Sequence, residues 1–160
     1  MARAPFVFPN SPAKACRDWL PVLLWMGVIF AGSGDVLSSA HTTRILGPLL
    51  HWLLPALSDQ GLTEVLFAIR KSGHVLEYAV LGALLWRAWD PPARGDSRSW
   101  NWAQAGWPLA LAALFAISDE CHQAFVPTRQ ASPWDVLLDS CGAALGIVAI
   151  RILRHNFKRG

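Results

Sequence analysis

Four apolar runs, separated by polar stretches that contain proline or glycine, set the pattern of this 160-residue chain. A helix needs about 20 apolar residues to cross the hydrocarbon core of a membrane. We predict membrane-spanning helices at residues 19–32, 75–89, 102–125 and 134–153. The chain is therefore expected to be all-α, an integral membrane four-helix bundle.

Two segments outside these spans are also expected to be helical. The second span continues a helix that begins at Thr63, an N-cap candidate, and runs without a breaker to residue 89. Before this helix, residues 46–57 are apolar but are interrupted by Pro48 and Pro55, so they are too short and too broken to cross a bilayer. We expect a short interfacial or re-entrant helical segment that covers the mouth of the bundle.

The first apolar run is short for a span, so a cleaved signal peptide is an alternative interpretation. Ala31, Gly32 and Ser33 are small residues near a possible cleavage site. We favour a retained helix, because residues 1–18 form a long lead and the later runs already hold the protein in the membrane.

Composition supports the membrane setting. Only 16% of the residues are charged and 53% are hydrophobic, whereas about a quarter of the residues in a soluble domain are charged. Several of the nine tryptophans lie at the ends of apolar runs, where such rings anchor helices at the headgroup level. No linker divides the chain, so we expect one domain with a lead at 1–18, a core at about 19–153 and a basic tail at 154–160.

The distribution of basic residues predicts the topology. Three Lys and Arg residues lie in the lead, three at the end of the second span and its loop, and four at and beyond the end of the fourth span, against four in the other two connections. The positive-inside rule then places both termini in the cytoplasm and the polar connections outside. The net charge of +3 does not indicate nucleic-acid binding, because the basic residues form no groove-reading helix.

The three cysteines indicate no metal site. Cys16, Cys121 and Cys141 lack ligand spacing, and an odd number cannot form a complete disulfide framework. We interpret them as small buried hydrophobes, with a bridge between Cys121 and Cys141 as the alternative.

Polar side chains gather at the outward ends of the helices. Spacings of three and four residues place Lys71, His74 and Tyr78 along one helical stripe, with Glu77 beside it. Ionisable groups in a membrane are candidates for function, because a charge at the centre of a span costs at least ~2.5 kcal/mol.

The third and fourth spans carry matching stripes. Asp119, Glu120 and Gln123 lie together on the third, and Arg129 follows in the turn. On the fourth, Asp135 and Asp139 continue into Gly142 and Gly146, small residues that let a neighbouring helix approach closely. We expect all three stripes to face one extracytoplasmic site.

These stripes resemble the VanZ-like family of small bacterial membrane proteins. RKSGHVLEYAVLGALL at residues 70–85 is similar to its Lys-x-x-His-x-x-x-Tyr-x-x-Leu-Gly element, and residues 118–146 are similar to its Asp-Glu-x-x-Gln-x-Phe-x-Pro-x-Arg and Asp-x-x-x-Asn-x-x-Gly elements. The chain departs at Asp139, where the family usually has Asn, and at Thr128, where Gly is common. The resemblance implies a multi-pass protein of the bacterial cytoplasmic (inner) membrane and a link to teicoplanin resistance.

Three functions remain open at this stage. The first is binding of an amphiphilic or lipid-linked ligand, or of a glycopeptide, in cell-envelope or teicoplanin-type resistance. The second is a membrane enzyme acting on a phosphate-bearing, lipid-linked envelope precursor, with Lys71 and Arg129 as a phosphate clamp. The third is a structural membrane protein whose polar network only fixes helix packing.

The same residues are the candidates under each function. The catalytic candidates are His74, Glu77, Asp119 and Glu120. The ligand-binding candidates are Lys71, Tyr78, Gln123, Arg129, Asp135 and Asp139. No cofactor is expected, although the carboxylates could hold a divalent cation such as Mg²⁺ through oxygen ligands.

Overall fold

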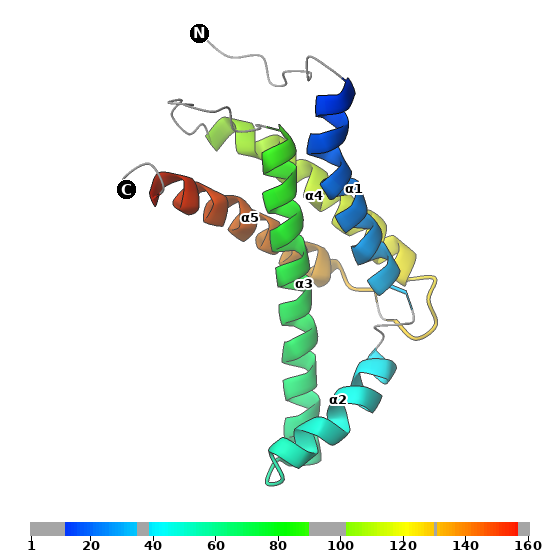
Figure 1. Ribbon diagram of the computed structural model, residues 1–160. Coiled ribbons are helices and arrows are strands. Elements are labelled where there is room, and N and C mark those ends of the chain that lie inside the picture. Colours follow the sequence, from blue (N-terminus) through cyan, green and yellow to red (C-terminus); the bar gives the residue numbers. More distant parts are fainter. Residues whose placement is uncertain (1–11, 35–38, 90–101, 130, 157–160) are drawn as a thin grey trace.

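The computed structural model describes residues 12–34, 39–89, 102–129 and 131–156. Within these ranges the chain forms α-helices and no strand, so the all-α fold is confirmed. The helices, in chain order, are α1 (Pro12–Gly32), α2 (Ser39–Leu53), α3 (Asp59–Trp89), α4 (Trp102–Gln123) and α5 (Pro133–Asn156) (Figure 1).

Helix α3 is the element on which the others assemble (Figure 1). Helix α5 crosses it and makes the most extensive contact with it, and α4 packs on both. Helix α1 lies beside the C-terminal half of α3, whereas α2 packs on the N-terminal half (Figure 1). The ends of α1 and α4 therefore meet near the middle of α3.

Two helices, α1 and residues 133–154 of α5, are long and apolar enough to cross a membrane. The large apolar side chains Leu23, Leu24 and Leu145 are 61%, 63% and 58% exposed on them, an arrangement that suits contact with lipid rather than water. The count of four spans goes beyond this observation and stays a prediction.

Small residues bring the backbones of α3 and α5 into direct contact. A Cβ atom on Gly146 would collide with the carbonyl of Ala79, and one on Gly82 would collide with the backbone of Ala143. A Cβ on Gly142 would lie 2.6 Å from a backbone oxygen of α3. The close helix approach predicted for the glycines of α5 is thus present.

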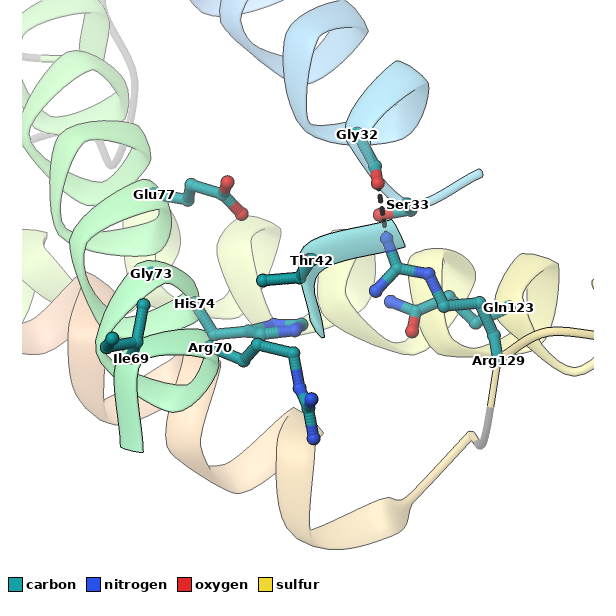
Figure 2. A pocket seen from close by; sticks show the side chains of 10 residues that line it. All are labelled: Gly32, Ser33, Thr42, Ile69, Arg70, Gly73, His74, Glu77, Gln123 and Arg129. Atoms are coloured by element: carbon teal, nitrogen blue, oxygen red, sulfur yellow. Dashed lines mark hydrogen bonds between the residues drawn. The ribbon is translucent and has the colours of Figure 1, made fainter. Parts of the chain in front are cut away.

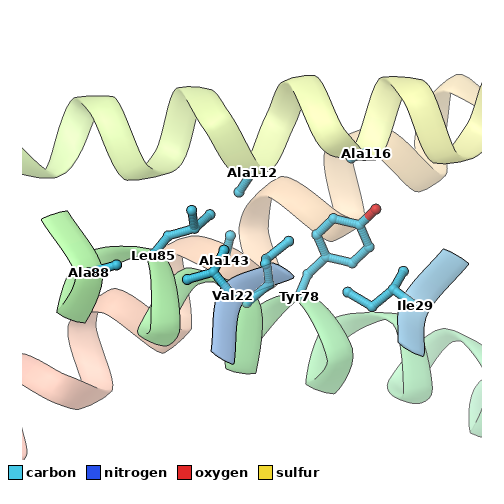
Figure 3. Close-up of a cluster of buried hydrophobic side chains, with 9 residues drawn as sticks. Val22, Ile29, Tyr78, Leu85, Ala88, Ala112, Ala116 and Ala143 are labelled. Carbon is cyan, nitrogen blue, oxygen red and sulfur yellow. The ribbon is translucent and has the colours of Figure 1, made fainter. Parts of the chain in front are cut away.

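An apolar core lies between α1, α3, α4 and α5 (Figure 3). Helix α1 is an integral part of it, because Val22 and Ile29 are only 1% and 2% exposed. The indole N–H of Trp25 also donates a hydrogen bond to the carbonyl of Glu77, at 2.9 Å. These contacts attach α1 to the rest of the bundle.

Helices α1 and α3 both begin earlier in the chain than the sequence predicts. Helix α1 begins at Pro12 rather than at residue 19, because proline is well accommodated in a first turn. Helix α3 begins at Asp59 rather than at Thr63, since the Ser58 hydroxyl accepts a hydrogen bond from the Gly61 N–H at 3.1 Å and caps the helix.

Further differences concern α2, the ends of the later helices and the cysteines. Pro48 lies inside α2, which replaces the broken segment predicted at 46–57 and ends before Pro55. Helix α4 ends at Gln123 instead of residue 125, and α5 continues to Asn156 instead of residue 153. The prediction of buried cysteines was wrong, because Cys16, Cys121 and Cys141 are exposed and free.

Replacing Gly146 with Ala is expected to destabilise the protein, because the new Cβ meets a backbone carbonyl that cannot move aside as a side chain can. Overpacking of this kind costs roughly 1–3 kcal/mol. Gly27→Ala is the matched control, since a Cβ there meets no atom within 4 Å. Thermal unfolding in detergent, followed by circular dichroism, should show a lower midpoint for Gly146→Ala alone. Equal midpoints for the two variants would contradict the close contact.

Candidate functional site

A polar cavity of about 150 Å³ opens where the ends of α1 and α4 meet the middle of α3 (Figure 2). A neighbouring hollow of about 120 Å³ shares four of its lining residues and extends toward the start of α5. The cavity is lined by Gly32, Ser33, Thr42, Ile69, Arg70, Gly73, His74, Glu77, Gln123 and Arg129. The cavity is thus built from α1, α2, α3, α4 and the turn before α5.

Two polar pairs join α3 to α5 beside this cavity. Lys71 forms a salt bridge with Asp135. One turn further along both helices, His74 Nδ1 lies 3.2 Å from Asp139 Oδ1, and Asp139 is fully buried. A carboxylate partner at Nδ1 fixes the imidazole with Nε2 as its other polar edge. The charges that face α5 are therefore already paired.

Asp119 ties α4 to the end of α1. Its Oδ2 accepts hydrogen bonds from the Ser33 hydroxyl at 2.7 Å and from the Gln123 amide at 3.1 Å, and the residue is 0% exposed. Glu120 has a different partner, because its Oε2 accepts the backbone N–H of Ser132 at 2.8 Å. Neither carboxylate lines the cavity; each holds a segment that shapes it.

Arg129 closes the cavity from the turn between α4 and α5. Its Nη2 donates to the carbonyl of Gly32 at 2.5 Å and its Nε to that of Gly34 at 3.1 Å, so it satisfies carbonyls at the end of α1 (Figure 2). Burial lowers the pKa of the Arg129 guanidinium from its ordinary value, and the charge of Asp119 opposes this shift.

Tyr78 does not reach the cavity. Its ring is fully buried in the apolar core, with its centroid 6.2 Å from that of Phe115 (Figure 3). The sequence stripe correctly places Tyr78 on the buried side of α3. The apolar body of the ring then packs among hydrophobic side chains instead of facing a ligand.

The structure divides the predicted site residues into three groups. His74, Glu77, Gln123 and Arg129 line the cavity. Lys71 and Asp135 line the adjoining hollow. The remaining four are buried behind these surfaces, namely Tyr78, Asp119, Glu120 and Asp139.

Arg70 was not among the catalytic or ligand-binding candidates chosen from the sequence, although it belongs to the same polar cluster as Lys71 and His74. Arg70, Gly73, His74 and Glu77 follow the i, i+3, i+4, i+7 spacing of one helix face, and all four line the cavity. The same spacing rule had been applied to the neighbouring stripe that starts at Lys71, which faces α5. Ser33 and Thr42 were also missed, and neither carries a sequence signal of its own.

No metal centre is formed by the part of the chain that the structure describes. Among those residues, no three His, Cys, Asp or Glu side chains come together in an arrangement that could hold a metal ion. Three of the carboxylates considered for Mg²⁺ instead make hydrogen bonds or ion pairs within the protein, namely Asp119, Asp135 and Asp139.

Comparison with known proteins gives one family and two relatives. The VanZ/LLP1 family matches residues 19–154. The iron(3+)-hydroxamate import system permease protein FhuB of Salmonella typhimurium LT2 is 32% identical over 157 residues, covering 84% of this chain and 22% of the permease. The permease of the same name from Escherichia coli K12 is 31% identical over 159 residues, covering 84% of this chain and 23% of the permease.

The chain spans about a fifth of the length of these curated relatives. No solved structure matches it. The similarity to membrane permeases, together with two helices able to cross a bilayer, identifies the chain as a membrane protein. The family match covers most of the chain and confirms the resemblance carried by its two polar elements: the chain belongs to the VanZ/LLP1 family.

Proposed function

We propose that this membrane protein binds the polar head of an amphiphilic or lipid-linked ligand in the cavity beside α3. The binding would serve the cell envelope, including resistance to teicoplanin-type glycopeptides. The observation that carries the proposal is a difference in pairing. Lys71 and Asp135 neutralise each other, whereas no hydrogen bond or ion pair joins the side chains of Arg70 and Glu77 to any other described residue.

Glu77 lies within the predicted second span, where an unpaired charge is costly, and Arg70 lies just before that span. Their presence around an open hollow is accounted for if a ligand supplies the missing partners. The paired residues deeper in the bundle have no such need, so their role is to hold α1, α4 and α5 in place around the hollow.

The surroundings of the cavity suit an amphiphile. Phe67 and Ile69 are 52% and 41% exposed next to the polar opening. On α2, Ile45, Leu49 and Trp52 form an exposed apolar row at helical spacing. A ligand head in the cavity would therefore leave its apolar tail against apolar side chains.

The proposed topology is that of a four-span protein of the bacterial cytoplasmic membrane. The second half of α3 and the whole of α4 complete the four spans with α1 and α5. Both termini lie in the cytoplasm under the positive-inside rule. The cavity then opens on the extracytoplasmic side, where α2 lies at the interface.

A second candidate function is enzymatic, and the pairing of His74 with Asp139 favours it. A carboxylate that orients an imidazole at 3.2 Å is the arrangement of a general base and its positioning group. The substrate would be a phosphate-bearing, lipid-linked envelope precursor. The import function named for the permeases belongs to those proteins, which are several times longer than this chain.

Ligand binding is expected to require the His74 imidazole itself, and not only the contact between His74 and Asp139 that joins α3 to α5. In bacteria that depend on the protein for teicoplanin tolerance, His74→Ala should abolish tolerance, and the double variant His74→Ala, Asp139→Asn should not restore it. The double variant removes the buried carboxylate that the single variant leaves unpaired. Membrane levels of each variant are measured by immunoblot, with lipid-facing Leu76→Ala as control.

A role limited to helix packing makes the opposite prediction. The double variant would then recover tolerance together with protein level, because both partners of the pair are removed. That recovery would contradict a ligand-binding role for His74. An altered lipid-precursor profile in cells carrying the variants would instead select the enzymatic candidate.

The proposed topology predicts from which side of the membrane a reagent can label introduced cysteines. In a chain without its native cysteines, Ala131→Cys should react with a membrane-impermeant maleimide added outside intact cells. A chain that keeps only Cys16, which is exposed near the start of α1, should react only after the cells are opened. Labelling of Ala131→Cys from the cytoplasmic side alone would overturn the outward-facing site.

A further inference from the structure

The cavity has charges of both signs on one face of α3. Arg70 and Glu77 are seven residues apart, which places them two turns apart and roughly 10 Å apart along the helix axis. Gly73 and His74 lie between them, and the gap over Gly73 holds no other atom within 4 Å of a Cβ position. The face thus presents a cationic end, an open middle and an anionic end.

Arg129 strengthens the cationic character of the cavity from the opposite wall (Figure 2). A guanidinium has five N–H donors. The hydrogen bonds that Arg129 donates to the carbonyls of Gly32 and Gly34, at and just beyond the end of α1, use only two of these donors, so further N–H groups remain for a ligand. Both Arg70 and Arg129 also line the adjoining hollow, whereas Glu77 lines only the first. The two guanidiniums therefore share a space that Glu77 borders on one side.

Several of the neighbouring charged groups are already paired within the protein. The Lys71 ammonium is held by Asp135, and the imidazole of His74 is held by Asp139. Asp119 and Glu120 lie outside the lining and accept hydrogen bonds from serines. The charged side chains left to meet a ligand are the two arginines and the single carboxylate, beside the uncommitted Nε2 edge of His74.

An anion alone would satisfy the arginines but would leave the Glu77 carboxylate facing a like charge. A cation alone would satisfy Glu77 and be repelled by the arginines. A head group with a phosphate and a primary ammonium gives every one of these charges a partner. Arginine pairs also suit phosphate geometry, because each guanidinium offers parallel N–H donors to the oxygens.

We infer that the cavity accepts a zwitterionic phosphoethanolamine-type head group, with the phosphate between Arg70 and Arg129 and the ammonium at Glu77. This inference rests on the proposed function, because it names the chemistry of the head that the cavity binds. It also replaces Lys71 by Arg70 as the partner of Arg129 in holding phosphate, since Lys71 is already neutralised by Asp135.

The test compares short-chain phospholipids that differ only in the head group. The full chain, purified in detergent, is titrated with dihexanoyl phosphatidylethanolamine, phosphatidylglycerol and phosphatidylcholine. The ethanolamine lipid should bind tightest, because phosphatidylglycerol lacks the ammonium and the choline nitrogen has no N–H to donate. Arg70→Gln should weaken its binding by roughly tenfold to a hundredfold, the range expected for a lost charge-assisted hydrogen bond.

Glu77→Gln should act differently from Arg70→Gln. It is expected to remove the preference for ethanolamine over glycerol, because only the partner of the ammonium has been lost. Glu64→Gln and Arg87→Gln, which change exposed charges near the two ends of the same helix, are the matched charge controls and should change nothing. Circular dichroism of every variant confirms the fold before the titrations.

The outcomes separate this inference from the proposed function. Equal binding of all three lipids, or a preference that survives Glu77→Gln, overturns the zwitterionic head group while leaving amphiphile binding intact. Absence of binding by every lipid and by teicoplanin overturns the proposed function itself. Free phosphoethanolamine is titrated in parallel, and binding as tight as that of the lipid would overturn a lipid as the source of the head group.

Discussion

Where Gly146 of α5 meets Ala79 of α3, neither backbone leaves room for another carbon atom. The same is true one step along, where Gly82 meets Ala143. Such contacts fix both the distance and the register of the two helices, because a shift along either axis would bring a larger side chain into the interface. This apolar contact aligns the polar middle of α3 with the polar start of α5.

That alignment explains how several charges are accommodated between helices. Lys71 is brought to Asp135 and His74 to Asp139, so that both carboxylates of α5 have a partner on α3. A buried pair of this kind contributes little net stability, but removing one member leaves a costly unpaired charge. Once one face of α3 is committed to α5, the adjacent face, which carries Arg70 and Glu77, is left open to the cavity.

Sequence periodicity was sufficient to find the helices and the stripe that faces α5, because small and polar residues at steps of three and four mark a helix interface. Periodicity could not show which of Lys71 and Arg70 pairs with α5 and which faces the cavity. Adjacent residues on a helix point about 100° apart, so both were compatible with a site, and only the position of Asp135 shows which is paired.

Other features depended on contacts that no local pattern encodes. Tyr78 has a polar tip, yet its ring is drawn into the core by Phe115 and its neighbours. Thr63 and Ser58 are both acceptable caps by type, and the hydrogen bond from the Gly61 N–H selects Ser58. The exposed position of Cys121 follows from the orientation of α4, which the buried Asp119 and Gln123 determine.

Photo-crosslinking at the cavity tests most directly whether it holds an amphiphile. A photoreactive amino acid in place of Ile69, at the edge of the cavity, is compared in living cells with one in place of the lipid-facing Leu145. Mass spectrometry of the adducts should show one class of amphiphile strongly enriched at position 69 over position 145. The same mixture of bulk lipids at both positions would contradict a ligand-binding cavity.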